Sequence, residues 1–197
     1  MGLSKQARIL SERQERIVIH LKTHLTAAPQ RNLVLFLLSI KAGLRAKEIA
    51  HIQWKMVFDS ESQIGDCIQL TNDVSKGDQG GRIIPLNQQL KKALIILFES
   101  NPPHHENVPI IISQRKAAFT PQTIVNWFSR LYADLEFNGH SSHSGRRTFV
   151  TRAAKNVIHA GGSLRDVQQL VGHSSLQTTQ HYIEGDSEAK KKLVELI

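Results

Sequence analysis

Cationic and hydrogen-bonding side chains lie at scattered points of this sequence, each near an expected turn or helix start. They are Arg45, Lys76, His143, Arg146, His173 and Tyr182. His143 and Arg146 form an H-x-x-R pattern, and His173 directly follows a glycine. Residue types of this kind suit a polyanionic ligand such as nucleic acid, because guanidinium and ammonium groups attract phosphate.

The distribution of charge is consistent with such a ligand. The chain carries 25 Lys and Arg against 17 Asp and Glu, which gives a formal net charge of +8. No acidic residue lies between Glu136 and Asp166, whereas the cations of that stretch include Arg152 and Lys155. A polyanion-binding face and a plain solvated basic face explain this pattern equally well.

Common motifs for other chemistries are absent from the sequence. It contains no GxxxxGKS/T phosphate loop, no GxGxxG, no HExxH and no GxSxG pattern. His20 and His24 lie one helical turn apart, but two ligands do not make a site, so we expect no bound metal. Cys67 is the single cysteine, which excludes an internal disulfide and a multi-cysteine metal site.

Length and composition indicate one domain with a substantial core. The chain has 197 residues, of which 40% are hydrophobic. Its longest apolar stretch, from Leu33 to Ile40, is far shorter than a membrane span, and its polar N-terminus is unlike a secretory signal. We therefore expect a cytoplasmic protein that makes no membrane contact.

Hydrophobic periodicity predicts mostly helices. The expected helices cover residues 11–28, 31–40, 45–54, 87–99, 120–135, 145–157, 163–172, 175–183 and 186–196. Short strands are expected at 56–59, 66–71 and 82–86, separated by turn-rich segments. The predicted fold class is α+β but mainly α, with a small three-stranded antiparallel sheet.

The order of five short motifs resembles the catalytic domain of the tyrosine recombinase (phage integrase) family. The motifs are G-L-R-x-x-E-I from Gly43, a lysine in a hairpin loop, H-x-x-R from His143, L-x-G-H-S-S from Leu170 and T-x-x-Y ending at Tyr182. H-x-x-R alone arises often by chance, but five motifs in order, each on a compatible element, are a specific signal. The resemblance extends from about residue 11 to the C-terminus.

The resemblance implies that a tyrosine cleaves one DNA strand, forming a 3′-phosphotyrosyl bond and freeing a 5′-hydroxyl. The hydroxyl of a partner strand then attacks that bond and rejoins the DNA. Tyr182 is the implied nucleophile, and the guanidinium groups of Arg45 and Arg146 bind the phosphate oxygens. Because the covalent link conserves the bond energy, no cofactor is implied.

The other motif residues have supporting roles in the same resemblance. His143 is the implied general base, and Lys76 on the hairpin is the proton donor to the leaving 5′-oxygen. His173 is expected to hydrogen-bond a phosphate oxygen. Glu48 lies three residues after Arg45 on one helix face and is expected to orient a guanidinium.

Further cations are expected to contact DNA. They are Arg82, Arg147, Arg152 and Lys155. Arg82 also competes with Lys76 for the hairpin role, and Arg147 stands where many relatives have histidine. The one other tyrosine, Tyr132, lies on the apolar stripe of the helix at 120–135 and is interpreted as core.

Domain organisation and assembly follow from the resemblance as expectations. Residues 1–10 form an N-terminal arm and residues 11–197 the catalytic domain, without the separate core-binding domain that precedes it in most members. Binding to double-stranded DNA is then weaker and more sensitive to salt, because fewer phosphates are neutralised. The family acts as a tetramer, which residues 186–197 would support by docking on a neighbour; the alternative is a helix folded back on its own core.

The function expected from these observations is that of a site-specific DNA recombinase or integrase, as in mobile elements. A DNA-binding regulatory module that retains the fold without complete strand exchange is an alternative. Relaxation of supercoiled DNA by the same chemistry, as in a topoisomerase, is another.

Overall fold

The computed structural model describes residues 6–24, 26–74 and 81–182. Within it the chain forms two compact units, Met1–Phe149 and Val150–Ile197. Residues 1–5 of the expected N-terminal arm (1–10) and the expected helix at 186–196 lie outside the described residues.

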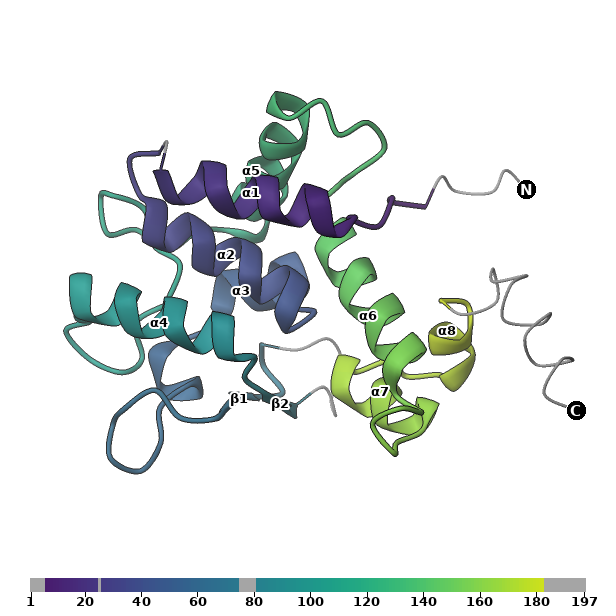
Figure 1. The fold of residues 1–197 in the computed structure, drawn as a ribbon. Coiled ribbons are helices and arrows are strands. Elements are labelled where there is room, and N and C mark those ends of the chain that lie inside the picture. Colours follow the sequence, from purple (N-terminus) through teal and green to yellow (C-terminus); the bar gives the residue numbers. More distant parts are fainter. Residues whose placement is uncertain (1–5, 25, 75–80, 183–197) are drawn as a thin grey trace, which may run out of the picture. The chain divides into compact units, whose positions relative to one another are not determined.

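Helices dominate the described part of the chain (Figure 1). They are α1 (Glu12–His24), α2 (Pro29–Lys41), α3 (Ala46–His51), the 3-10 helix η1 (Trp54–Met56), α4 (Gln88–Ser100), α5 (Pro121–Asp134), α6 (Ser144–Asn156), α7 (Leu164–Val171) and α8 (Leu176–Gln180). The strands are β1 (Cys67–Leu70) and β2 (Arg82–Pro85). The predicted class, mainly helical with a small antiparallel sheet, is confirmed.

The first helices begin where their local sequence predicts. The Ser11 backbone N–H donates to Gln14 Oε1 at 3.0 Å, and the Gln14 N–H donates to Ser11 Oγ at 3.2 Å, which completes a capping box at α1. The expected extension of α1 to Ala28 is wrong, because α1 ends at His24. Pro29 opens α2, where its missing N–H costs no hydrogen bond.

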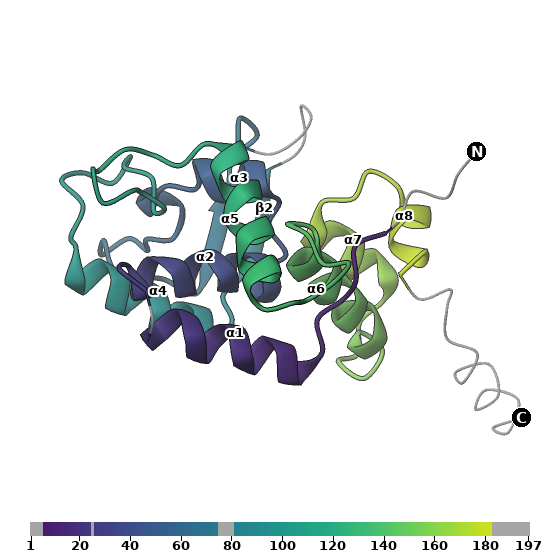
Figure 2. The same cartoon turned by 90° about the horizontal axis from the view of Figure 1, so that it is seen from above.

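The core of the first unit is built around α2. Every residue from Val34 to Ile40 is buried, as the nearly continuous apolar run predicts. Helix α2 lies between α1 and α4 and contacts both (Figures 1 and 2). Helix α3 packs against α5. The segment that follows α2, residues 42–45, is therefore attached to the most rigid part of the unit.

Among the described residues the sheet has two strands rather than the predicted three. β1 and β2 pair antiparallel, with Leu70 opposite Arg82. The third strand expected at 56–59 is wrong, because η1 and a tight loop occupy that segment, with only an isolated bridge between Phe58 and Ile64. The ring centroids of Trp54 and Phe58 lie 6.0 Å apart, which fits a compact turn. In an extended strand the Cα atoms of residues i and i+4 would be about 13 Å apart.

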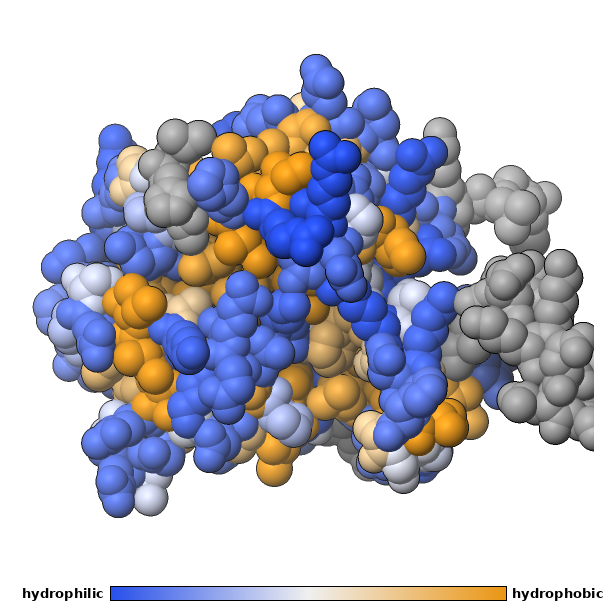
Figure 3. Space-filling model, viewed as in Figure 1, coloured by the Kyte–Doolittle hydropathy of each residue, from blue (hydrophilic) through white to orange (hydrophobic). Residues whose placement is uncertain are grey.

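The surface of the described residues mixes polar and apolar groups. On the face drawn in Figure 3, hydrophobic patches are broken up by hydrophilic residues. The large hydrophobic side chains that are exposed come from separate parts of the sequence: Ile9, Ile83, Ile96 and Ile158. Among the described helices, none is both long and apolar enough to cross a membrane.

Candidate functional site

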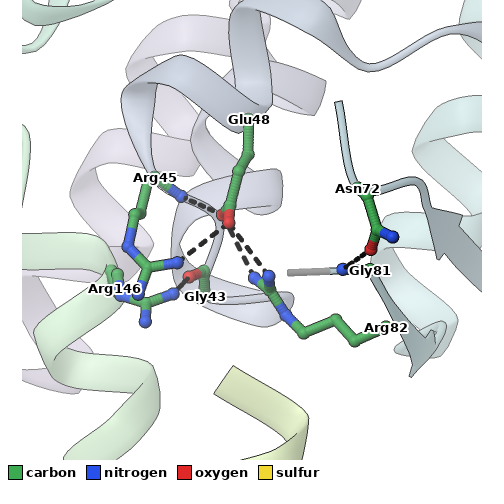
Figure 4. A network of polar contacts seen from close by, with 7 residues as sticks. All are labelled: Gly43, Arg45, Glu48, Asn72, Gly81, Arg82 and Arg146. Carbon is green, nitrogen blue, oxygen red and sulfur yellow. Dashed lines mark hydrogen bonds and ion pairs between the residues drawn. The ribbon is translucent and has the colours of Figure 1, made fainter. Parts of the chain in front are cut away.

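Gly43 joins two of the motifs in the first unit. Its backbone has φ of +65°, and a Cβ at this position would lie 2.5 Å from the ring of Phe149. Only glycine meets both conditions without strain. Its carbonyl oxygen accepts a hydrogen bond from Nη1 of Arg146, 103 residues further along the chain. The G-L-R and H-x-x-R motifs are therefore brought to one loop, as Figure 4 shows.

Close helix packing places Arg146 on that loop. Gly145 at the start of α6 lies against α2 so closely that a Cβ would meet Ser39 Oγ at 2.3 Å. Ser144 is buried, and its Oγ accepts from the N–H of Ser141 at 2.9 Å. Arg146 is only 5% exposed. The first turn of α6 is thus fixed against the core, and the Arg146 guanidinium is fixed with it.

Glu48 on α3 binds both Arg45 and Arg82 (Figure 4). Its Oε1 accepts from Arg45 Nη1 at 2.9 Å and from Arg82 Nη1 at 2.9 Å. Its Oε2 accepts from the Arg45 backbone N–H at 2.7 Å and from Arg82 Nη2 at 3.1 Å. The expectation that Glu48 orients a guanidinium agrees with these contacts, and the fork of Arg82 is the additional feature.

The Glu48 carboxylate is the most buried charge of this cluster. Its side chain is 1% exposed. Burial raises the pKa of Glu48, but the hydrogen bonds and charges of Arg82 and Arg45 outweigh it, so the pKa lies below its usual value. Glu48 is therefore ionised at neutral pH, and its charge is compensated within the cluster.

The two arginines that bind Glu48 differ in exposure. The Arg45 side chain keeps 27% of its surface exposed, whereas the Arg82 side chain keeps 7%. Arg82 was expected to contact DNA, but its guanidinium lies in a buried ion pair with Glu48. Sequence spacing could not indicate this pair, because 34 residues separate its members.

His143 lies directly before α6, three residues from Arg146. Its ring is exposed, and its carbonyl accepts the Arg147 N–H at 2.8 Å. The nearby His140 is placed differently, with one ring nitrogen 3.2 Å from the carbonyl of Ile9 and the other 3.2 Å from that of Phe137. Of these two histidines, His143 has the more accessible ring.

Arg147 binds the segment that precedes α1. Its Nη1 donates to the carbonyl of Ala7 at 2.6 Å, and Leu10 donates its N–H to Thr148 Oγ1 at 2.8 Å. Arg147 was expected to contact DNA. The structure gives it a half-buried position in which it holds residues 7–10 against the start of α6. Nothing in its local sequence indicates this contact.

The second unit holds His173 and Tyr182 together. Their rings stack with centroids 5.8 Å apart and an interplanar angle of 19°. His173 Nδ1 lies 3.0 Å from Oγ1 of the buried Thr179, and the Tyr182 N–H donates to the Thr179 carbonyl. The L-x-G-H-S-S and T-x-x-Y motifs thus meet at Thr179, the first residue of the T-x-x-Y motif.

Three expected site residues remain: Arg152, Lys155 and Lys76. Arg152 and Lys155 lie on the part of α6 that belongs to the second unit, half-buried and exposed respectively. Lys76 lies outside the described residues. Among the residues that the structure describes, no group of three or more His, Cys, Asp and Glu side chains could hold a metal ion.

Tyr132 belongs to the core, as predicted. It is 2% exposed, and its ring stacks on Phe128 and Phe137 with centroids 6.0 and 6.4 Å away. Burial raises the pKa of its phenol, and its hydroxyl has no hydrogen-bond partner within the described structure. A buried phenol that is difficult to ionise is a poor nucleophile, which leaves Tyr182 as the candidate.

Comparison with known proteins agrees with the motif order. The sequence profile of the phage integrase family matches residues 8–188. The chain belongs to the phage integrase family. A relative, tyrosine recombinase XerC of Bradyrhizobium diazoefficiens, is 31% identical over 150 residues, which is 75% of this chain and 43% of the relative.

Solved structures of recombinases share the fold of this integrase-family chain. The crystal structure of XerA recombinase has a TM-score of 0.72 at 23% identity, covering 95% of this chain and 64% of that one. The Tn1549 transposon integrase in complex with circular intermediate DNA has a TM-score of 0.72 at 20% identity, covering 100% and 68%. The chain spans about half the length of the curated relatives it matches.

Proposed function

We propose that this chain is the catalytic portion of a tyrosine-type site-specific recombinase that cleaves and rejoins double-stranded DNA. The observation that carries the proposal is the link between Arg45 and Arg146. Residues from two distant motifs reach one loop, where Gly43 accepts a hydrogen bond from Arg146 and Glu48 binds Arg45. Membership of the phage integrase family supports the same conclusion.

Arg45 and Arg146 provide the groups that a scissile phosphate requires. Negative charge accumulates on the non-bridging oxygens as phosphorus becomes five-coordinate, and guanidinium groups held in place stabilise that charge. Preorganised donors of this kind are commonly worth about 3–4 kcal/mol each in a water-poor site. The buried anchors of both arginines keep them ordered before DNA binds, so little reorganisation is needed.

Tyr182 then attacks phosphorus through its phenol oxygen. Its proton passes to His143, the bond from phosphorus to the 5′-oxygen breaks, and Lys76 supplies the proton that the leaving oxygen takes up. His173 hydrogen-bonds a phosphate oxygen in the same step. The stacked ring of His173 and the hydroxyl of Thr179 hold Tyr182 and His173 in a fixed relation within their unit.

Rejoining reverses these steps with a different strand. The 5′-hydroxyl of the partner strand attacks the 3′-phosphotyrosyl bond, and Tyr182 leaves with its proton restored. One phosphodiester is exchanged for another, so the chemistry requires no nucleotide cofactor.

The wider assembly forms part of the same proposal. Arg152 and Lys155 contact the DNA backbone, and residues 186–197 dock on a neighbouring copy to build a tetramer on DNA. Such an enzyme works in the cytoplasm, where its DNA is. Action on a mobile element is part of the proposal, because the integrase of the Tn1549 transposon shares the fold.

A trapped covalent complex tests this proposal. Duplexes that bind the chain are selected from a random DNA pool, and the selected duplex is rebuilt with a nick beside the mapped cleavage position. The nick releases a short fragment, so the protein remains attached to the DNA. Wild-type protein should form the complex, and Tyr182→Phe should abolish it.

Tyr132→Phe is the matched control for this experiment. It removes the same hydroxyl from a buried ring that has no hydrogen-bond partner in the described structure, so folding and complex formation should persist. If the covalent complex forms with Tyr182→Phe, the assigned nucleophile is wrong. If cleavage occurs without any protein attached to DNA, the proposed reaction is wrong.

A further inference from the structure

We infer that Arg82 is a positioning residue that compensates the charge of Glu48, so that the cluster keeps a net positive charge at Arg45. The inference rests on the proposed function, because it concerns how Arg45 meets a phosphate. Arg82 was expected to be a DNA contact, and nothing in its sequence position suggests this second role. Four observations support it.

The first observation is the geometry of the shared carboxylate. Arg82 binds Glu48 with both arms of its fork, at 2.9 Å to Oε1 and 3.1 Å to Oε2. Arg45 makes one side-chain bond to the same group and one through its backbone N–H. A bidentate pair fixes the plane of a carboxylate. The fork of Arg82 and the Arg45 backbone N–H therefore set the orientation of the Glu48 carboxylate together, and the Arg45 guanidinium is aligned on it.

The second observation is the count of charges. Glu48 and Arg45 taken as a pair sum to zero, which leaves the neighbouring Arg146 to supply the positive charge of the site. With Arg82, two guanidinium groups share the Glu48 carboxylate, so Arg45, Arg82 and Glu48 together carry +1 in addition to the charge of Arg146. Arg82 is the inner partner, at 7% exposure, and Arg45 is the outer one, at 27%. The surplus charge is thus available on the side from which a ligand can approach.

The third observation is how β2 directs Arg82 inward. Side chains alternate along a strand, and here Ile83 is 66% exposed whereas Ile84 is 1% exposed. Arg82 shares the inward face with Ile84. A cation on the buried face of a strand requires a partner, and Glu48 is that partner.

The fourth observation is the fixed start of β2. The Gly81 N–H donates to Asn72 Oδ1 at 2.7 Å, as Figure 4 shows. A Cβ on Gly81 would lie 2.7 Å from that oxygen and 3.1 Å from the carbonyl of Leu70. The backbone from which Arg82 projects is therefore held by contacts that leave no room for a larger residue. Because its backbone is held in place, Arg82 binds the Glu48 carboxylate from a fixed position.

A direct DNA contact makes different predictions from a positioning role. Loss of a phosphate contact weakens DNA binding and lowers the salt dependence of the affinity by about one unit. Loss of a positioning residue slows cleavage at saturating DNA and leaves that salt dependence unchanged. The two roles are therefore separated by measuring rate and affinity independently.

The experiment uses the full chain and the selected, nicked duplex described above. Arg82→Met should slow covalent-complex formation at saturating DNA at least tenfold, which corresponds to about 1.4 kcal/mol of barrier. Its dissociation constant and salt dependence should stay within twofold of wild type. Arg82→Lys, which keeps the charge and loses the fork, should slow the reaction less. Arg130→Met removes an exposed arginine of α5 and is the control for a simple loss of charge.

The double variant Arg82→Met with Glu48→Gln tests charge compensation itself. With the Glu48 charge removed, Arg82 has nothing to compensate, so its loss should cost less than threefold relative to Glu48→Gln alone. This comparison, together with Arg82→Lys, also decides the matter if Arg82→Met fails to fold, which thermal unfolding monitored by circular dichroism reports.

Three results would overturn the inference. They are a wild-type cleavage rate in folded Arg82→Met, a lowered salt dependence with an unchanged rate, and an undiminished loss in the Glu48→Gln background. Failure of the proposed function is distinguishable from all of these, because wild-type protein itself would then form no covalent complex.

Discussion

Replacement of Gly43 by alanine perturbs the loop that joins Arg45 to Arg146. Gly43 has φ of +65°, and a Cβ there would lie 2.5, 3.0 and 3.1 Å from three atoms of the Phe149 ring. The ring cannot move away easily, because its nearest atoms include those close to its attachment point. The substitution must therefore displace either the loop or the start of α6, and either shift disturbs the bond from Arg146 to the Gly43 carbonyl.

The expected cost has two parts. A left-handed backbone costs a non-glycine residue roughly 1–2 kcal/mol. Crowding of a packed ring typically costs about 1–3 kcal/mol. The free energy of unfolding should therefore fall by about 2–5 kcal/mol, a large fraction of the stability of a domain of ordinary size.

Urea denaturation of Gly43→Ala and Gly139→Ala measures this cost. Gly139 also belongs to the first unit and has φ of +82°, but a Cβ there would meet the side chain of Arg8, which is flexible and exposed. Gly139→Ala should therefore lose only the backbone part, roughly 1–2 kcal/mol. Equal losses in the two variants, or a loss below about 0.5 kcal/mol in Gly43→Ala, would refute the reasoning, since surface substitutions without structural effect lie in that range.

Two further predictions concern Glu48 and Arg147. The pKa of Glu48 is lowered in the folded state, so its stabilising effect is present above its unfolded value of about 4.3 and is lost as the pH falls through the folded value. In Glu48→Gln the free energy of unfolding should therefore fall less steeply below about pH 4.3 than in wild type, as measured by denaturation at a series of pH values. The same pH dependence in both proteins below about pH 4.3 would contradict this. Arg147→Met removes the bond to the Ala7 carbonyl and should cost about 0.5–1.5 kcal/mol of stability, without altering the salt dependence of DNA binding. A salt dependence lowered by about one unit would instead identify Arg147 as a phosphate contact.

Features that depend on neighbours in sequence could be predicted. The capping box of Ser163 and Asp166 forms at α7 as its spacing indicates, and Thr120 caps α5 by accepting the Thr123 N–H. The buried character of α2 follows from its composition. Capping contacts of this kind join residues three or four positions apart, so the sequence alone identifies both partners.

Features that depend on distant partners could not be predicted. The chain near Phe58 folds into a turn because its ring packs on Trp54 and on Phe98 of α4, and the sequence at 56–59 is equally compatible with a strand. Arg147 and Arg82 were both interpreted as surface cations. Their partners, Ala7 and Glu48, lie 140 and 34 residues away.

The candidate site shows the same division. Motif order selected the candidate residues, and Glu48 could be assigned to Arg45 because they lie three residues apart at the start of α3. The two arginine motifs are joined by the hydrogen bond from Arg146 to the Gly43 backbone carbonyl. No side-chain type in the sequence indicates a bond to a backbone carbonyl, so this contact could not be predicted. Ala42 closes α2, and Gly43 after it supplies the left-handed conformation of the loop that Arg146 contacts.

Identification of the amino acid that becomes attached to DNA tests whether Tyr182 is the nucleophile. The trapped complex is digested with nuclease and protease, and the peptide that keeps a nucleotide is sequenced by mass spectrometry. If Tyr182 attacks the scissile phosphate as proposed, this peptide carries a nucleotide joined through its 3′-phosphate to the oxygen of Tyr182. A nucleotide on any other residue, or on Tyr182 through a 5′-phosphate, would contradict it.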